Sequence, residues 1–117
     1  MTVNTEVVYS TTRTVQATAG EVVADSFSIN TYRSAKYIIT CEDYTTDNKG
    51  YWTGEIILAH DGTNTVITVF GEVDIGDQSM NPIIAADIRS GNVRLKVTTT
   101  SDQQVVTSHR SVITKYT

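Results

Sequence analysis

The residues of this chain best suited to chemistry are two histidines, one cysteine and a set of acids in turns. His60 is followed directly by Asp61, and His109 lies in a different predicted strand. A catalytic triad needs a nucleophile, a base and an orienting acid that converge in space. Asp61 and Gly62 are already accounted for as a hairpin turn, so we expect no catalysis at this pair. We predict that the chain is not an enzyme.

Metal and thiol chemistry have little support in the sequence. One cysteine and two separated histidines do not supply a zinc site. The acids of two polar loops could offer oxygen ligands to calcium, but neither loop has the alternating acidic pattern of a dedicated calcium loop. The residues concerned are Asp43, Asp47, Asn48, Asp74 and Asp77. We therefore expect no metal and no cofactor. Cys41 lies in an apolar alternating run and is predicted to be a buried, inert thiol.

The aromatic residues around the loop at 43–50 form the one candidate contact site. Tyr44, Tyr51 and Trp52 flank this loop, and aromatic faces beside Asp and Asn side chains can hold a sugar by stacking and hydrogen bonding. Trp52 follows the apolar alternation of its strand and is predicted to face the core. Tyr51 points the other way. Tyr44 and Tyr51 are therefore the candidate contact residues for a ligand or a partner.

The elements that must position these residues are β-strands. Val, Ile and Thr make up 45 of the 117 residues, and β-branched side chains favour pleated strands over helices. The length predicts a single domain, and the single cysteine excludes an internal disulfide. No apolar run is long enough to span a membrane, and residues 1–5 lack the basic and apolar regions of a signal peptide.

Alternation of apolar residues predicts seven to nine short strands and no helix. After one or two strands within 3–17, broken around 10–12, the predicted strands are 22–29, 35–41, 51–60, 65–73, 83–89, 93–99 and 105–116. Asp25 interrupts the apolar face of its run, which suggests a local bend. Gly54 and Gly71 lie within strands and suggest bulges or close backbone approach.

The connections between the predicted strands decide the fold class. Asp61-Gly62 and Gly91-Asn92 mark tight turns, and no connection is long enough for a parallel crossover. We therefore expect an all-β fold, an antiparallel two-sheet β-sandwich or jelly roll. It should occupy residues 21–117, with residues 1–20 as an N-terminal strand or arm.

The charges are distributed unevenly along the chain. The net charge is −4; nine acids and one base lie in 42–87, whereas five bases and one acid lie in 88–117. We favour pairing between neighbouring strands of one domain. The alternative is that acidic and basic faces of neighbouring copies meet in an oligomer. An acidic chain without a basic cluster is not expected to bind nucleic acid, and no membrane partner is expected.

Several short strings along the chain carry a family resemblance. They are Asp25-Ser26-Phe27-Ser28, Tyr32-Arg33-Ser34-Ala35-Lys36-Tyr37, Glu55-Ile56, His60-Asp61-Gly62-Thr63, Ala85-Ala86-Asp87-Ile88 and Gly91-Asn92-Val93-Arg94-Leu95. In this order and spacing, over residues 22–115, the chain resembles a small β-domain of virion structural proteins of tailed bacteriophages, cyanophages especially. That domain occurs in fibre-like, neck or other particle-surface proteins.

The resemblance implies a non-enzymatic structural protein of a phage virion, assembled in the host cytoplasm. Because this chain is nearly all domain, we favour a capsid decoration (cement) protein bound to the major capsid protein. The alternative is a neck, tail or fibre component, which could include a glycan-binding receptor module. We expect a homo-oligomer, and by analogy with the threefold axes of capsids and fibres, a homotrimer.

Overall fold

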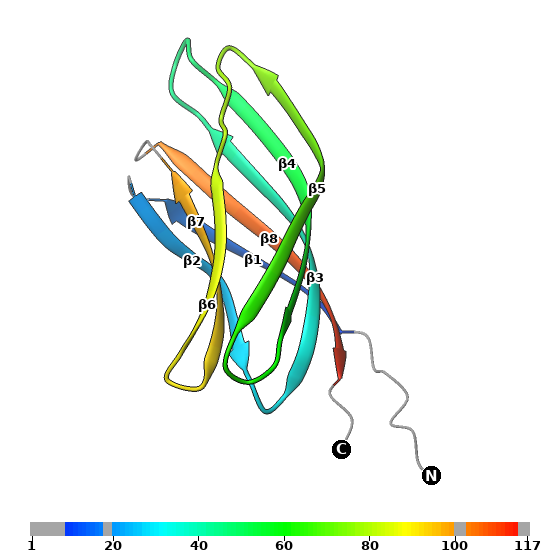
Figure 1. Ribbon diagram of the computed structural model, residues 1–117. Helices are drawn as coiled ribbons and strands as arrows, with labels where there is room; N and C mark the ends of the chain where they lie inside the picture. The colour runs from blue at the N-terminus through cyan, green and yellow to red at the C-terminus, as the bar shows by residue number, and fades with distance from the viewer. Residues whose placement is uncertain (1–8, 18–19, 100–102, 115–117) are drawn as a thin grey trace.

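The computed structural model describes residues 9–17, 20–99 and 103–114, with side chains described at 20–99 and 103–111 (Figure 1). The strands are β1 (Tyr9–Ala17), β2 (Gly20–Ser28), β3 (Tyr32–Asp43), β4 (Gly50–His60), β5 (Thr65–Gly76), β6 (Ile83–Arg89), β7 (Asn92–Thr99) and β8 (Gln104–Thr114). Within these described ranges the chain forms no helix, and hence none that could cross a membrane.

The eight strands form two sheets that pack face to face (Figure 1). The larger sheet has the order β1-β8-β3-β4-β5, and the smaller sheet has the order β2-β7-β6. Every recorded strand pair is antiparallel. The predicted antiparallel two-sheet β-sandwich is therefore confirmed.

The strand boundaries follow the sequence pattern closely, with one difference. Each strand predicted from residue 22 onward is present, and β3 and β5 extend up to three residues further than predicted. The predicted break at 10–12 is wrong, because β1 continues through these residues and pairs with β8 along its whole length. Ladder hydrogen bonds to a neighbouring strand thus outweigh the polar local sequence. Most of the strand predicted at 3–9 lies outside the described residues.

The core consists of the inward-facing residues of both sheets. β3, β4 and β7 each bury alternate side chains, and the largest of these are Tyr37, Ile39, Trp52, Ile56, Leu58, Val93, Leu95 and Val97. Trp52 is buried, as predicted. Cys41 is also fully buried, as predicted, and this burial raises the pKa of its thiol to about 12.

A β-bulge at Gly71 and Glu72 interrupts the pairing of β4 with β5. The pairs Thr53↔Val73 and Glu55↔Phe70 leave one extra residue on β5 opposite Gly54, and Gly71 has a φ of 63°. The ring of Trp52 lies over Gly54, where a Cβ would come within 2.4 Å of the ring. Its Nε1 donates a hydrogen bond to Oε1 of Glu72 at 3.2 Å. The bulge predicted from the two glycines is confirmed, and the indole ring fills the space beside it.

A second bulge turns a carboxylate into the core. The register of β2 against β7 shifts between Val23 and Asp25, which confirms the predicted local bend. Asp25 is 5% exposed. Its Oδ2 accepts hydrogen bonds at 2.9 Å from the hydroxyl of Tyr37 and from Nη1 of Arg110. Tyr37 and Arg110 face each other across β3 and β8, so this cluster ties the smaller sheet to the larger one.

Aromatic rings enclose the Arg110 guanidinium. Its Cζ lies 5.9 Å from the ring centroid of Phe27 and 5.7 Å from that of Tyr32, distances at which a cation is attracted to the ring face. Burial, followed by the neighbouring Asp25 charge, raises the pKa of the Tyr37 hydroxyl. Tyr37 therefore stays protonated and acts as a hydrogen-bond donor to the carboxylate.

We predict that Arg110→Met lowers the free energy of unfolding by about 3 kcal/mol, because it leaves the Asp25 carboxylate buried without its cation. Urea denaturation would measure the loss. The matched control is Arg94→Met, which breaks an ion pair at the surface and should lower the free energy of unfolding clearly less. Equal losses in the two variants would contradict a special role for the buried cluster.

Candidate functional site

The histidine and acid that suggested catalysis both shape the hairpin between β4 and β5. His60 Nδ1 accepts a hydrogen bond from the Gly62 N–H at 3.0 Å, which leaves Nε2 to donate to the Tyr32 carbonyl at 2.7 Å. Asp61 accepts from the backbone N–H groups of Asn64 and Thr63, and these bonds lower the pKa of its carboxyl. His60 is buried, whereas His109 belongs to β8 and lines a depression on the outer face of the larger sheet.

Asp77 joins the two polar loops, and the other loop acids also accept hydrogen bonds from the chain. Asp77 Oδ2 accepts a hydrogen bond from the Lys49 N–H, and the Asp77 N–H donates to the Lys49 carbonyl. Asp43 accepts from Thr45, and Asp74 from Ser79. Across the described residues, no group of three His, Cys, Asp or Glu side chains is placed to hold a metal ion.

Tyr44 and Tyr51 are both exposed near the same end of the larger sheet. Their exposed fractions are 43% and 38%. Tyr51 lies on the outer face of β4, directly opposite Glu42 of β3, and Tyr44 follows Glu42 by two residues. Both predicted contact residues thus lie near Glu42, Tyr51 across the strand pair and Tyr44 further along the chain. The Tyr44 N–H is held by the Gln103 carbonyl at 3.0 Å.

A larger feature, not anticipated from the sequence, is an apolar surface on the outer face of the larger sheet. Nine large hydrophobic residues are exposed in the described part of the chain, and seven of them lie on this face of β3, β4 and β5, namely Tyr51 and six aliphatic or Phe residues. We call these six the outer patch: Ile38, Ile57, Val66, Phe70, Val73 and Ile75. Tyr51, opposite Ile75, borders it.

The strand register makes the outer patch continuous. Ile57 lies diagonally next to Ile38 on one side and to Phe70 on the other, because Ile38, Glu55 and Phe70 share one row across the sheet. Val73 and Ile75 continue the patch along β5. Contiguous apolar surfaces of this kind mark interaction sites more often than scattered exposed residues do.

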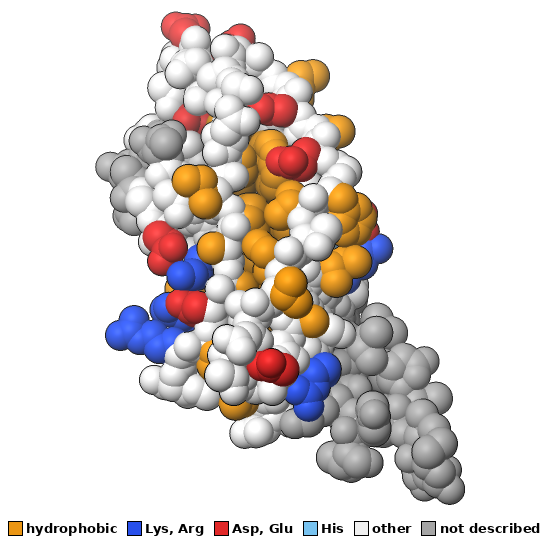
Figure 2. Space-filling view, in the orientation of Figure 1, with side chains coloured by type: hydrophobic (Ala, Val, Ile, Leu, Met, Phe, Trp, Pro, Cys, Tyr) orange, Lys and Arg blue, Asp and Glu red, His pale blue; other side chains and the backbone are white. Residues whose placement is uncertain are grey.

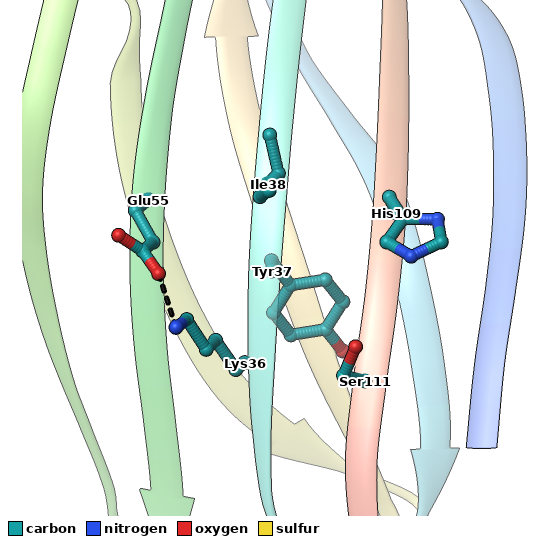
Figure 3. A pocket seen from close by; sticks show the side chains of 6 residues that line it. All are labelled: Lys36, Tyr37, Ile38, Glu55, His109 and Ser111. Atoms are coloured by element: carbon teal, nitrogen blue, oxygen red, sulfur yellow. Dashed lines mark ion pairs between the residues drawn. The ribbon is translucent and has the colours of Figure 1, made fainter. Parts of the chain in front are cut away.

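One ion pair lies within the outer patch. Lys36 on β3 pairs with Glu55 on β4, beside a depression of about 220 Å³ on the outer face (Figure 3). Ile38, His109 and Ser111 also line this depression, whereas the Tyr37 side chain lies on the inner side of the sheet. The depression is small for an organic ligand, since such sites usually exceed about 300 Å³.

β5 carries apolar side chains on its inner face as well. Ile67 and Val69 pack against the core from β5, as Ile84, Ala86 and Ile88 do from β6. Figure 2 shows hydrophobic side chains gathered between β6 and β5 and along the β5 side of the molecule. The signal for the outer patch was therefore present in the sequence, as apolar residues at both odd and even positions of 65–76.

The outer face of the smaller sheet has a different character, because charged residues cover it. Arg94 donates two hydrogen bonds to Asp87, at 2.7 and 2.5 Å. Lys96 lies 3.0 Å from Asp87 and 3.6 Å from Glu21. Three bases of the C-terminal segment, counting Arg110, thus have partners within the domain. For Arg94 and Lys96 the favoured expectation of pairing between neighbouring strands is confirmed, whereas Arg110 pairs with Asp25 of the opposite sheet.

Comparisons with known proteins found likeness in structure alone. No protein-family model matches the chain, and no curated protein matches it in sequence. Among solved structures it is similar to the tailspike protein of Acinetobacter baumannii phage AM24, with a TM-score of 0.53, 8% identity and 92% of this chain covered. It is also similar to the tailspike protein of Acinetobacter phage vB_ApiP_P1, with a TM-score of 0.56, 16% identity and 91% covered.

A third similar structure is the tailspike protein gp49 from Acinetobacter baumannii bacteriophage Fri1, a capsular polysaccharide depolymerase. It has a TM-score of 0.53 and 18% identity over 93% of this chain. The chain spans only 26%, 22% and 18% of the three tailspike chains. At these identities the likeness establishes a shared fold with one part of each tailspike.

The charged face of the smaller sheet generates a prediction about pH. Hydrogen bonds from Arg94, helped by Lys96, outweigh partial burial and hold the pKa of Asp87 at about 2, below its ordinary value of 3.8. A carboxyl whose pKa is lower in the folded state stabilises the fold above its unfolded pKa and loses that effect as pH falls through the folded pKa.

We expect Asp87→Asn to lower the free energy of unfolding by roughly 1 kcal/mol at neutral pH, since the ion pairs are partly solvated. The difference from wild type should shrink as pH falls below 3.8 and vanish near about 2. Urea titrations at a series of pH values would measure it. A difference that stays constant over that range would contradict the assignment.

Proposed function

We propose that this chain is a non-enzymatic structural component of the tail or fibre of a tailed-phage particle. The observation that carries the proposal is the fold: over nine tenths of the chain superimposes on part of a phage tailspike, in each of three structures. The virion-protein resemblance of the sequence strings supports the same class of role independently.

The structural comparisons support the tail or fibre alternative better than capsid decoration, which the sequence alone favoured. The proposed partners are further copies of the chain, arranged as a homotrimer, and neighbouring tail proteins. Nucleic acid and membranes are not among them. The side chains that suggested catalysis support a structural role, because His60 and Asp61 are engaged in hairpin hydrogen bonds.

Immunogold labelling of purified phage particles would test this location. We expect an antibody against the chain to label tails or fibres and not heads, and mass spectrometry of separated tails to recover the chain. Labelling of the head would instead support the alternative that the chain is a capsid decoration protein. Absence from both fractions would overturn a structural role in the virion.

Glycan binding is a second candidate function, favoured by one observation. Tyr44 and Tyr51 are both exposed near Glu42 at the loop end of the larger sheet, and Tyr51 is the cross-strand partner of Glu42. Such an arrangement can stack on a sugar ring while the acid accepts hydrogen bonds from its hydroxyls. One of the similar tailspikes is a capsular polysaccharide depolymerase, so bacterial capsular polysaccharide is the natural ligand to test.

If this second function holds, the chain should bind purified capsular polysaccharide, and Tyr51→Ala should weaken binding by about tenfold or more, the loss of one stacking contact. Ile83→Ala is the matched control, because Ile83 is an exposed hydrophobic residue on β6, away from the tyrosines. Binding by calorimetry or on a glycan array would measure both. No binding by the wild-type chain would exclude this candidate.

A further inference from the structure

β5 has the side chains of a covered strand but the position of an edge strand. It lies at the end of the larger sheet, yet Ile67 and Val69 face the core while Val66, Phe70 and Val73 are exposed on the other side. Strands that are apolar on both faces normally lie inside a sheet with both faces covered. Long apolar edge strands left open invite association with other chains.

The Lys, Arg and Pro residues that often protect an edge strand are missing from β5, although the bulge at Gly71 and Glu72 interrupts this edge. Its sequence, from Thr65 to Gly76, contains no Lys, Arg or Pro. Its two acids are occupied at the bulge and the following loop: Glu72 accepts from Trp52, and Asp74 accepts from Ser79 and from the Met80 N–H. Because both acids are hydrogen-bonded within the chain, they are not placed to repel another chain that approaches the outer patch.

We propose that copies of this chain associate by packing their outer patches against one another. This inference goes beyond the homotrimer of the proposed function, because a patch-to-patch contact is two-fold and joins copies in pairs. A sheet face with interleaved apolar side chains can stack against a second sheet face about 10 Å away. Such contact buries Ile57 and its neighbours Ile38 and Phe70, which the isolated chain leaves in water.

The charges within the outer patch favour a second copy over an unrelated partner. The chain as a whole is acidic, with a net charge of −4, so copies repel one another wherever acidic surfaces meet. The patch itself holds one base and one acid, Lys36 and Glu55. When two copies meet patch to patch, Lys36 of each can face Glu55 of the other. A partner whose surface carried charges of only one sign would repel either Lys36 or Glu55.

Replacing the apolar centre of the patch tests the inference directly. Light scattering with size-exclusion chromatography should find the wild-type chain as an oligomer and Ile38→Thr with Ile57→Thr as a monomer, its dissociation constant raised by roughly tenfold or more. Threonine is chosen because it keeps β-branching and strand preference. Ile83→Thr, at a residue 64% exposed on the smaller sheet, should remain oligomeric.

A charge exchange tests whether the occupant is a second copy. Lys36→Glu makes the patch acidic and Glu55→Lys makes it basic, so each variant alone should be monomeric. An equal mixture of the two should associate again, because opposite patches then meet. Thermal melting should show both variants folded, since the broken pair is largely exposed. A monomeric wild-type chain overturns the inference, and so do variants that all remain oligomeric.

These outcomes are separable from the proposed location in the phage. An oligomer that depends on the outer patch, formed by a chain absent from phage tails, would uphold this inference and overturn the proposed function. A chain found in tails but monomeric, or oligomeric through another surface, would do the reverse.

Discussion

A buried carboxylate sets how the two sheets of this sandwich lie against each other. Asp25 lies at a bulge of β2, and its Oδ2 accepts hydrogen bonds from the Tyr37 hydroxyl and the Arg110 guanidinium of the opposite sheet. A hydrophobic core tolerates some sliding of one layer over the other. A buried charge does not tolerate such sliding, because separation from its partners would leave it unpaired in an apolar interior. We infer that the core supplies most of the stability and this cluster fixes the relative position of the layers.

Local regularities of the sequence were enough to predict the strands. Period-two alternation located β2 to β8, and the Asp61-Gly62 and Gly91-Asn92 turns separated neighbouring strands, because hairpins are specified by residues close in sequence. Gly54 and Gly71 indicated a bulge for the same reason. Where the local pattern and a distant partner disagreed, as at residues 10–12, pairing with β8 decided the structure.

The candidate surface was harder to predict because it depends on which strands become neighbours. Asp25 and Arg110 are 85 residues apart, and nothing local to either indicates the other. The outer patch likewise combines residues from three strands, and it is exposed because it lies on the face of the larger sheet that points away from the smaller sheet. The sequence located Tyr44 and Tyr51 correctly as exposed residues, since each depends only on alternation within its own strand and loop.

The bulge in β5 has a consequence for how relatives of this domain can diverge. Val66 and Phe70 occupy even positions, and Val73 and Ile75 occupy odd ones, yet all four face outward because one extra residue at Gly71 and Glu72 reverses the alternation between them. The outward-facing apolar residues of β5 therefore occupy even positions before the bulge and odd positions after it. Deleting the extra residue would turn Val73 and Ile75 toward the core without any substitution, so a one-residue deletion could remove two of the six residues of the outer patch.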